Sequence, residues 1–588
     1  MKTRKTPAMA ALLCASLILG GCTGQTAAAE TSAAQTEPTV ETTVSAETAA
    51  GASTEATALD TTGLFSDRDL AGTYDESEAV AIQLNGDTAA CDSDTVTIEG
   101  GQVVIKGEGV YLLSGTLTDG QIVVNAGDTD KVQLVLAGVD ITSSTSAAIY
   151  ALEADKVFVT LAAGTENTLT NGGTYVAIDD NNIDAVIFSK TDLTLNGTGS
   201  LTLNAQAGHG VAAKDDLVIT GGVYTISAAS HGLSAKDSIA IAAGSFAITS
   251  GKDGIHAENA DDLSLGTLYI ADGSFSIQSQ GDAISAQGAL QIDGGTFDLY
   301  TGEGSASVEM TDSTEFGQMG GGPGNVRGDA PADAPTDAPT DIPTDGSADV
   351  PADAPMDAPA DASDDASSTE TEEETVSQKG IKGESSFTIR DGVFVIDSAD
   401  DCLHAGGEML LAAGTYTLSS GDDAIHCDDA LTIQSGSYSI PYCYEGVEGL
   451  SVTIEDGTFD ITSNDDGINA AGGADSSGFG GFGGRQQDSF ASASESFILI
   501  NGGSLTVVSS GDCVDSNGDL TINGGTLNLT CNGNGNTALD CDGSYTNNGG
   551  DVTTNDGSEA NPGQMGGGKG TAPSGGGHSG RQTDLAAS

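Results

Sequence analysis

Tryptophan is absent from the 588 residues of this chain, and aromatic residues make up only 4 % of it. Glycine, in contrast, accounts for 83 residues. This composition disfavours a thick globular core and favours a repetitive fold of short strands and many turns.

Basic residues are also scarce. Eighteen lysines and arginines face 86 aspartates and glutamates, which gives a formal net charge of −68. Nucleic acids and anionic lipid surfaces are bound through clustered positive charge, so we expect neither as a partner. An uncharged ligand, a cation, or an anion bridged by cations is compatible with this charge.

Cysteine does not form a usable framework. Two of the nine cysteines, Cys14 and Cys22, lie in the N-terminal leader described below, and seven remain. An odd number is not typical of a disulfide framework, and the chain has no C-x-x-C motif that would indicate a zinc site. We expect most of these cysteines to be small apolar side chains in or beside the strands.

A short apolar strand followed by an acidic turn is the unit that recurs along the chain. The acidic residue of the turn returns at steps of 22, 22 and 21 residues, at Asp401, Asp423, Glu445 and Asp466. A period of this length with short strands, glycine turns and no helical pattern predicts an all-β solenoid, a parallel β-helix with about 22 residues per coil.

The strands of the repeat carry an aromatic residue at one fixed position. Equivalent positions in successive coils stack about 4.8 Å apart. We therefore predict an internal ladder formed by Tyr224, Phe246, Phe275, Phe297, Phe394, Tyr416, Tyr438 and Phe459.

The acidic turns predict a metal site. Carboxylates stacked at that spacing repel one another unless protons or a cation lie between them. Ca²⁺, with oxygen ligands at roughly 2.3–2.6 Å, can span two coils. The alternative is that these are solvated turn residues, because aspartate is common in turns. The predicted cofactor is Ca²⁺, with the ligands Asp400, Asp401, Asp422, Asp423, Asp428, Asp429, Glu445, Glu448, Asp465 and Asp466.

The acidic turns differ in how much they are expected to contribute. We expect replacement of Asp422 and Asp423 by asparagine to cost more calcium-dependent stability than the same change at Asp512 and Asp515.

The N-terminus has the pattern of a sorting signal. A basic start and an apolar run end at Cys22, and residues 1–22 resemble a bacterial lipoprotein signal in which that cysteine is acylated. A plain secretory signal cleaved nearby is the alternative. We expect an exported protein, anchored by lipid to the outer face of the cell membrane, with residues 23–59 as a disordered tether.

Composition divides the rest of the chain. We predict β-helix over residues 60–302, a disordered Gly/Pro/Asp-rich insertion over 303–383, and β-helix again over 384–548. The second part contains a Gly-rich loop at 472–496, and a disordered tail follows at 549–588. The repeat continues in the same register after the insertion, which favours one interrupted solenoid over two separate ones.

Catalytic signals are weak. A polysaccharide lyase needs a basic residue beside the metal, and none of Lys379, Lys382 and Arg390 falls in the acidic column of the sequence repeat. Gly208-His209-Gly210 partly matches a polygalacturonase pattern, but a similar His231-Gly232 recurs one coil later without an Arg-x-Lys companion. We therefore assign no catalytic residue.

Several longer motifs resemble a known family. They are Val110-Tyr111-Leu112-Leu113-Ser114-Gly115-Thr116-Leu117, Lys131-Val132-Gln133-Leu134-Val135-Leu136-Ala137-Gly138-Val139, Gly164-Thr165-Glu166-Asn167-Thr168-Leu169 and Gly421-Asp422-Asp423-Ala424-Ile425-His426. They are similar to bacterial exported carbohydrate-binding proteins. That resemblance implies a right-handed, single-stranded parallel β-helix that carries calcium, binds polygalacturonate and cellulose, and shares the fold of pectate lyases without a demonstrated need for catalysis.

The resemblance also locates the acidic turn motif of that family, on Asp253, Asp282, Asp401, Asp423, Glu445 and Asp466. This chain departs from it at His209 and His231, where neutral imidazole would be a poor calcium ligand. The expected function is recognition of plant cell-wall polysaccharide, most plausibly acidic pectin, without cleavage. The alternatives are a calcium-dependent pectate lyase and a surface adhesin or scaffold with purely structural calcium; the sugar-binding residues stay unassigned.

Overall fold

The computed structural model describes residues 59–176, 181–262, 264–310, 377–471 and 496–562, all within one compact unit, Glu55–Ser588. Nearly all elements are strands; the short helices are α1 (Asp67–Ala71) and the 3₁₀ turns η1 (Ser305–Ser307) and η3 (Ser558–Ala560). In this part of the chain no helix is long and apolar enough to cross a membrane. The predicted signal with Cys22, nearly all of the tether, and most of the insertion, loop and tail lie outside the described residues.

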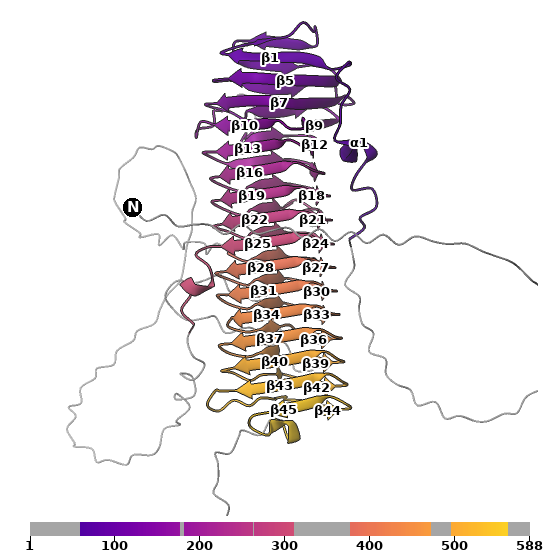
Figure 1. Cartoon of the computed structure of the whole chain (residues 1–588), viewed down its shortest axis with the longest axis vertical. Coiled ribbons are helices and arrows are strands. Elements are labelled where there is room, and N and C mark those ends of the chain that lie inside the picture. Colours follow the sequence, from indigo (N-terminus) through magenta and orange to yellow (C-terminus); the bar gives the residue numbers. More distant parts are fainter. Residues whose placement is uncertain (1–58, 177–180, 263, 311–376, 472–495, 563–588) are drawn as a thin grey trace, which may run out of the picture. The chain divides into compact units, whose positions relative to one another are not determined.

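The strands stack in three columns (Figure 1). The first column, A1, contains mostly four-residue strands: β9 (Lys156–Leu161), β12 (Asp192–Gly197), β15 (Asp216–Ile219), β18 (Ser238–Ile241), β21 (Thr267–Ile270), β24 (Ala289–Ile292), β27 (Ser386–Ile389), β30 (Glu408–Leu411), β33 (Ala430–Ile433), β36 (Ser451–Ile454), β39 (Phe497–Ile500), β42 (Asp519–Ile522) and β44 (Tyr545–Asn547).

The second column, A2, follows A1 across a short glycine turn in each coil. Its strands are β10 (Glu166–Asn171), β13 (Ser200–Ala205), β16 (Val223–Ala228), β19 (Ser245–Ser250), β22 (Ser274–Ser279), β25 (Thr296–Thr301), β28 (Val393–Ser398), β31 (Thr415–Ser420), β34 (Ser437–Tyr442), β37 (Thr458–Ser463), β40 (Ser504–Ser509), β43 (Thr526–Cys531) and β45 (Asp551–Thr554). The N-terminal strands β1 (Val80–Gly86), β5 (Gly109–Leu117) and β7 (Lys131–Ser143) join A1 and A2 into one sheet, with β2 (Ala89–Ala90) against β1.

The third column, sheet B, closes each coil. It consists of β3 (Val96–Glu99), β4 (Gln102–Ile105), β6 (Gln121–Asn125), β8 (Ile149–Glu153), β11 (Ala185–Ser189), β14 (His209–Ala213), β17 (Leu233–Ala235), β20 (Ile255–Ala257), β23 (Ile284–Ala286), β26 (Ile381–Gly383), β29 (Leu403–Ala405), β32 (Ile425–Cys427), β35 (Val447–Glu448), β38 (Ile468–Ala470) and β41 (Asp515–Ser516).

Pairing between coils is parallel, as predicted. Among the described strands only β1–β2 and β3–β4 pair antiparallel. Hydrogen bonds between equivalent residues of neighbouring coils span 22 residues from Asp401 to Asp423 and again from Asp423 to Glu445. The all-β solenoid fold predicted from the sequence is therefore the fold of this chain.

The core is a single apolar interior filled by alternate residues of each strand. The predicted aromatic ladder runs through it, with ring centroids of successive members 4.6 to 5.1 Å apart from Tyr224 to Phe459. Leu505 and Leu527 continue the same row beyond Phe459. Because these side chains stack on their own counterparts, each coil repeats the geometry of the last.

The insertion does not divide the solenoid. Strand β25 pairs directly with β28, so Phe297 stacks on Phe394 with centroids 4.7 Å apart. The predicted boundaries need small corrections, because β26 begins at Ile381, inside the range assigned to the insertion, and β45 lies beyond residue 548. Residues 303 to 310 are also structured and contain η1. The order of segments agrees with the prediction of one interrupted solenoid.

Candidate functional site: two polar columns at the edge of sheet B

The acidic residues of the repeat lie where column A2 turns into sheet B. There the side chain of one coil accepts a backbone hydrogen bond from the next coil: Asp401 Oδ1 accepts from the Asp423 N–H (3.0 Å), and Asp423 Oδ1 accepts from the Glu445 N–H (3.1 Å). A short side chain with an acceptor atom is therefore favoured at this position. The first column consists of His209, His231, Asp253, Asp282, Lys379, Asp401, Asp423, Glu445, Asp466 and Asp512.

A second polar column lies beside the first, three residues further along each coil. It is formed by equivalent residues of the short sheet B strands, which are in register between coils. The two columns interact: His404 Nδ1 is 2.9 Å from Asp401 Oδ2. The second column consists of Ser234, His256, Ser285, Lys382, His404, His426, Glu448, Asn469 and Asp515.

Lys379 occupies the first column, between Asp282 and Asp401. Its Nζ lies 2.9 Å from Asp400 Oδ1 and 2.7 Å from Asp401 Oδ2, and the side chain is buried. The expectation that no lysine stands in the acidic column was wrong, because the insertion separates Asp282 and Lys379 by 97 residues and hides their shared register.

The consequence is that the ammonium group of Lys379 supplies the cation beside two of the predicted calcium ligands. Burial by itself would raise the pKa of Asp401, but the charge of Lys379 and the hydrogen bond to His404 outweigh it and hold that pKa below its usual range.

In the next coil His426 is the basic residue that lies beside the carboxylates. Its Nδ1 lies 3.1 Å from Asp423 Oδ2 and 2.9 Å from Glu448 Oε2, while Nε2 lies 3.1 Å from Asp428 Oδ1. Burial opposes a charge on this imidazole, yet the three carboxylates outweigh burial and raise the pKa of His426 well above its ordinary value. This imidazolium offsets one of the three negative charges, and burial still raises the pKa of Asp423 and that of Glu448 to about 7.

The N-terminal end of the columns is a stack of histidines. The rings of His209 and His231 are 5.1 Å apart and those of His231 and His256 are 4.3 Å apart. His256 Nδ1 lies 2.6 Å from Asp253 Oδ2, and His256 Nε2 lies 2.9 Å from Glu258 Oε2. The predicted departure from the acidic motif at His209 and His231 is thus real, and here too the acid has a protein cation as partner.

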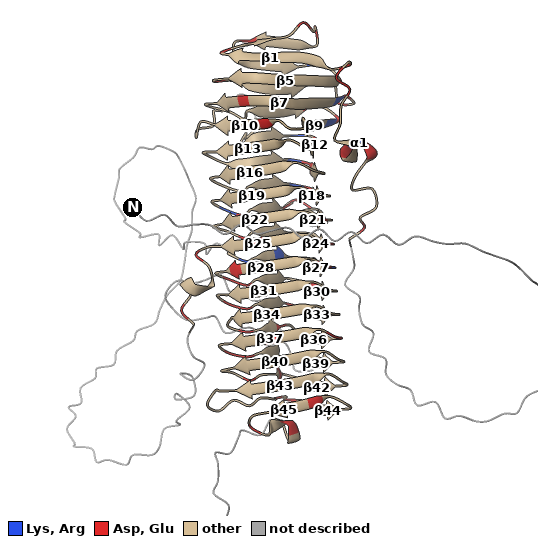
Figure 2. Ribbon diagram, in the orientation of Figure 1, with Lys and Arg blue, Asp and Glu red and all other residues tan. Residues whose placement is uncertain are grey.

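A different arrangement begins at Glu445. We call Glu445, Asp465, Asp466, Asp512 and Asp515 the acidic segment. Between residues 427 and 562 the only Lys, Arg or His in the sequence is Arg485, which lies outside the described residues. Figure 2 shows the same contrast, with blue ribbon only in the coils up to β28. Within the described chain, no basic side chain is available to these carboxylates.

The pKa values in the acidic segment reflect this crowding. Burial, and after it the charges of Asp515 and Asp465, raise the pKa of Asp466 well above its ordinary value. Burial also raises the pKa of Asp512 to about 7, helped by Asp515. Burial, followed by Glu448, raises that of Glu445 well above the usual range. Each shift has the direction expected of carboxylates that share one low-dielectric site without a counter-ion.

The donor atoms of the acidic segment are all oxygen, and four of its carboxylates approach others in two groups. Gly511 makes room for them: a Cβ at that position would fall 2.2 Å from Asp466 Oδ1 and 2.4 Å from Asp465 Oδ1. One oxygen each of Asp512, Asp515 and Asp540 also lies within 4.8 Å of the other two. Carboxylate oxygens from adjacent coils are the donor set that Ca²⁺ prefers.

The other predicted ligands have separate outcomes. Asp400, Asp401 and Asp422 are brought together, with one oxygen from each within 4.8 Å, but Lys379 is at the same place. Asp429 is exposed, on the turn after β32, and takes no part in either column. Asp512 and Asp515 were not among the predicted ligands; their signal in the sequence was the continuation of the repeat after the Gly-rich loop.

We call the coils that carry Asp253 to Asp423 the paired coils. They also contain a hollow of about 600 Å³ on sheet B, lined by Asp253, His256, Asp282, Lys382 and Glu384 among others. Lys382 Nζ is bound 2.6 Å from Glu384 Oε1. Burial lowers the pKa of Lys382, but Glu384 and Asp282 outweigh it and raise the pKa above its ordinary value. A lysine held as ammonium cannot abstract a proton, so this geometry does not favour lyase chemistry at Lys382.

Fold and site together define a β-solenoid with a carboxylate-rich edge. A family profile described as "Carbohydrate-binding domain-containing protein" matches residues 99–424 and 422–574, well over half of the chain. The chain belongs to this family of carbohydrate-binding domain proteins.

Two similar proteins accompany this match. A protein of Acetivibrio thermocellus with the same description is 41 % identical over 150 residues, which are 25 % of this chain and 52 % of the relative. The chain thus spans about half the length of that curated relative. A solved structure of a polysaccharide lyase-like protein from C. thermocellum, a gadolinium derivative, is 37 % identical and covers 37 % of this chain and 87 % of its own, with a TM-score of 0.35.

Proposed function

We propose that this protein binds acidic plant cell-wall polysaccharide of the polygalacturonate type, through Ca²⁺ held by the acidic segment, and does not cleave it. The observation that carries the proposal is the set of five crowded carboxylates in coils whose described residues contain no basic side chain. A divalent cation bound there would neutralise the carboxylates and keep coordination positions for the carboxylates of a uronate chain. Membership of the carbohydrate-binding family supports a glycan as ligand.

The residues present fit calcium better in the acidic segment than in the coils before it. Glu445, Asp465 and Asp466 are retained from the predicted ligands, and Asp512 and Asp515 are added. Asp401 has Lys379 and Asp423 has His426 as a partner, so these two acids need calcium less than the acids of the acidic segment, which have no basic partner among the described residues. The expected order of importance is therefore reversed, with Asp512 and Asp515 ahead of Asp422 and Asp423.

The remaining features of the proposal follow from the sequence. We place the protein outside the cell, anchored through acylated Cys22 and an extended tether, with a right-handed solenoid of about 22 residues per coil. Cellulose is a further ligand that the family resemblance implies. The ion pairs of Lys379 and Lys382 weigh against the lyase alternative, because each lysine is held as a cation.

The test is titration calorimetry of the full chain with polygalacturonate, with calcium and with a chelator, while the ultraviolet absorbance of unsaturated lyase products is followed in the same samples. We expect heat of binding only with calcium, and constant absorbance. Rising absorbance would replace the proposal by lyase activity, and absence of heat under both conditions would leave a surface scaffold.

A matched pair of variants locates the site. Asp466→Asn combined with Asp512→Asn should abolish calcium-dependent binding. Asp422→Asn combined with Asp428→Asn removes the same number of charges in the paired coils and should leave binding nearly unchanged. Equal losses in both variants would contradict the assignment to the acidic segment.

A further inference from the structure

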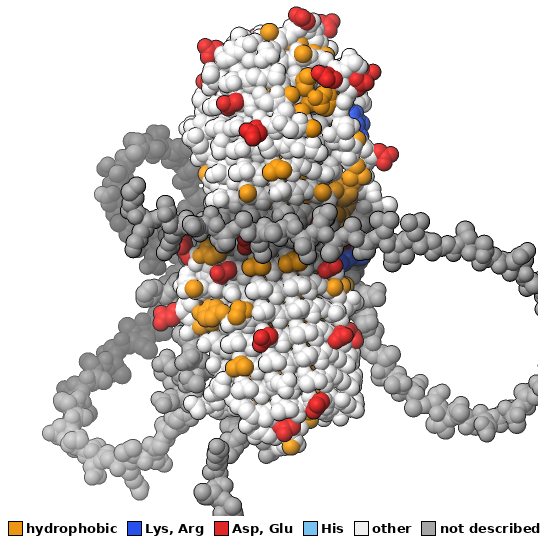
Figure 3. All heavy atoms as spheres, in the orientation of Figure 1, with side chains coloured by type: hydrophobic (Ala, Val, Ile, Leu, Met, Phe, Trp, Pro, Cys, Tyr) orange, Lys and Arg blue, Asp and Glu red, His pale blue; other side chains and the backbone are white. Residues whose placement is uncertain are grey.

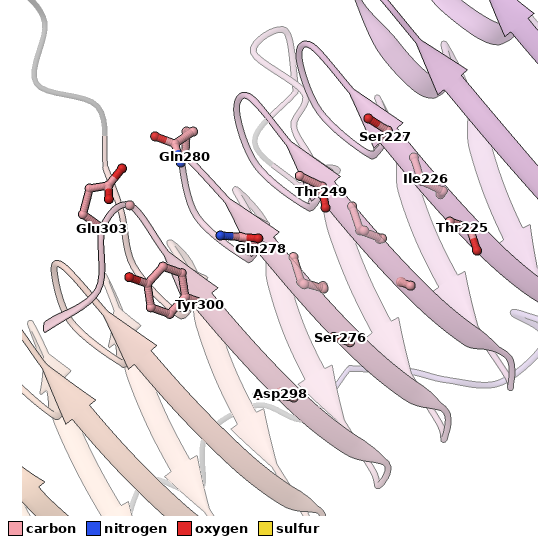
Figure 4. A pocket seen from close by; sticks show the side chains of 14 residues that line it. Thr225, Ile226, Ser227, Thr249, Ser276, Gln278, Gln280, Asp298, Tyr300 and Glu303 are labelled. Atoms are coloured by element: carbon pink, nitrogen blue, oxygen red, sulfur yellow. The ribbon is translucent and has the colours of Figure 1, made fainter. Parts of the chain in front are cut away.

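The outer face of column A2 is hollowed where β16, β19, β22 and β25 lie side by side (Figure 4). The hollow measures about 550 Å³ and runs across four coils. It lies on the A2 face, away from the two polar columns of sheet B, and neither the predicted calcium ligands nor the acidic segment line it.

Uncharged polar side chains form most of its surface. Thr225, Ser227, Thr249, Ser276 and Gln278 are exposed, and they project outward because they alternate with the buried residues of each strand. Hydroxyl and amide groups of this kind donate and accept hydrogen bonds, which is the capacity needed to bind sugar hydroxyls. Strand pairing repeats these groups at each coil step of about 4.8 Å.

One end of the hollow is closed by Tyr300, where the chain leaves β25 and enters the turn with η1. The ring is held in place, because a Cβ on Gly304 would lie only 2.7 Å from Tyr300 Cε2, so that the glycine packs directly on the ring. The turn itself is fixed by the Ser305 N–H, which donates to Asp397 Oδ1 at 2.7 Å. Tyr300 is therefore a half-buried, oriented aromatic surface beside the row of hydroxyls.

The charges of the hollow restrict its ligand. No lysine, arginine or histidine lines it, while Asp298 and Glu303 do. A polyuronate would be repelled there, in contrast to the acidic segment, where calcium would mediate. On the face that Figure 3 shows, most of the visible surface is neither charged nor hydrophobic, with scattered acidic and hydrophobic side chains.

We infer that this hollow is a second glycan site, which binds a neutral polysaccharide chain by hydrogen bonds to the threonine, serine and glutamine row and by stacking of one sugar ring on Tyr300. The inference rests on the proposed function for its class of ligand, a glycan, and it assigns a site to a neutral chain such as the cellulose named there. It differs in site, in the charge of the ligand, and in needing no cation.

The chain offers a matched control for the aromatic residue. Tyr442 is an exposed tyrosine in the same outward row as Tyr300, reached through Asp397 and Ser419 at three coil steps, and it lies outside the hollow. The affinity of full-length Tyr300→Ala and Tyr442→Ala for a soluble neutral β-glucan is measured by affinity gel electrophoresis in the presence of a chelator.

We expect an affinity loss of about tenfold or more for Tyr300→Ala, as for other aromatic anchors, and for Gln278→Ala combined with Thr249→Ala a smaller loss; Tyr442→Ala should bind like the parent protein. Thermal unfolding of each variant checks that the fold is intact. Unchanged binding by Tyr300→Ala, or absence of neutral-glucan binding by the parent protein, would overturn the inference.

The same variants separate this site from the proposed one. Tyr300→Ala should keep calcium-dependent binding of polygalacturonate, and Asp466→Asn with Asp512→Asn should keep binding of the neutral glucan. Loss of both ligands in either variant would contradict two independent sites.

Discussion

Two stretches of the same polar columns solve the problem of stacked carboxylates in different ways. Between Asp253 and Asp423 three acids of the first column have a cation from the protein: His256 beside Asp253, Lys379 beside Asp401, and His426 beside Asp423. The fourth, Asp282, accepts hydrogen bonds from the Ser377 hydroxyl and the Lys379 N–H. The acidic segment from Glu445 to Asp515 has the same backbone geometry but no basic side chain among the described residues.

The difference shows that the negative charge at one backbone site can be offset either by a basic side chain of the protein or by a cation from solution. In the paired coils the cation belongs to the chain, so the electrostatic stability of those coils is independent of solution conditions other than pH. In the acidic segment the cation must come from solution as a proton or a metal ion. We therefore expect calcium to stabilise one stretch and to leave the other unaffected.

The largest expected effect follows from removing the lysine that makes the paired stretch self-sufficient. Lys379→Met leaves Asp400 and Asp401 buried without their cation, which should lower the free energy of unfolding by about 3–5 kcal/mol. Denaturant unfolding with and without calcium measures this loss. We further expect calcium to restore part of it in the variant, because the site then resembles the acidic segment.

Arg390→Met serves as the control for that experiment. Arg390 lies 3.3 Å from Asp293 with half of its side chain exposed, and exposed pairs contribute at most about 1 kcal/mol. A loss for Lys379→Met no larger than this would show that the lysine is not the counter-ion of the column.

The next largest effect is expected from two Asp→Asn variants, which should change the free energy of unfolding in opposite directions when calcium is absent. Asp401→Asn removes the nearer of the two carboxylate partners of Lys379 and should destabilise the protein by about 3 kcal/mol. Asp466→Asn removes one charge from a crowded group and should stabilise it by about 1 kcal/mol, while an amide oxygen still accepts the hydrogen bond from the Asp512 N–H. Urea unfolding of chelator-treated protein measures both changes in the free energy of unfolding. If both changes had the same sign, the two stretches would not differ as proposed.

Acidic pH should weaken the histidine end of the paired stretch. Burial, and then the charges of His231 and Lys214, lower the pKa of His209 to about 3, although Asp184 lies 3.8 Å from it. The unfolded chain binds a proton near pH 6.5 and the folded chain does not, so stability falls below pH 6.5 by on the order of 1 kcal/mol per pH unit. His209→Gln should flatten this part of the pH profile of thermal unfolding.

His256 should act in the opposite direction. Burial disfavours its charge, but Asp253 and Glu258 outweigh burial and raise the pKa of this imidazole above its ordinary value, even with His231 stacked on it. Its contribution is complete below the unfolded pKa near 6.5 and is lost as pH rises through the raised folded pKa. His256→Gln should therefore cost more stability at pH 6 than at pH 9, and a uniform cost would contradict the shift.

The smallest effect is expected at Asp429. This predicted ligand is exposed and belongs to neither column, so Asp429→Asn should change the free energy of unfolding by no more than about 0.5 kcal/mol, with or without calcium. A clear loss of the calcium-dependent increase in Tm would place a metal ligand on the turn after β32.

Much of this arrangement was accessible from the chain alone, because a solenoid repeats its local rules. The aromatic ladder and the row of Asp401, Asp423 and Glu445 were predicted with the correct register from their spacing. The position of Lys379 in the column was not predicted, because its neighbour Asp282 lies 97 residues earlier in the sequence, on the other side of the insertion. The hollow at Tyr300 also gave no periodic signal, because it depends on the departure of one turn from the repeat.

The sequence by itself determined the all-β solenoid, its period and the presence of a carboxylate column, because stacking places equivalent residues of neighbouring coils in contact. It also determined that Arg485 is the only basic residue between residues 427 and 562. Only the tertiary structure decided which carboxylates have a protein cation and which do not. That distinction depends on distances of a few ångströms between side chains from different coils, and the charge interaction changes steeply over such distances in a buried site.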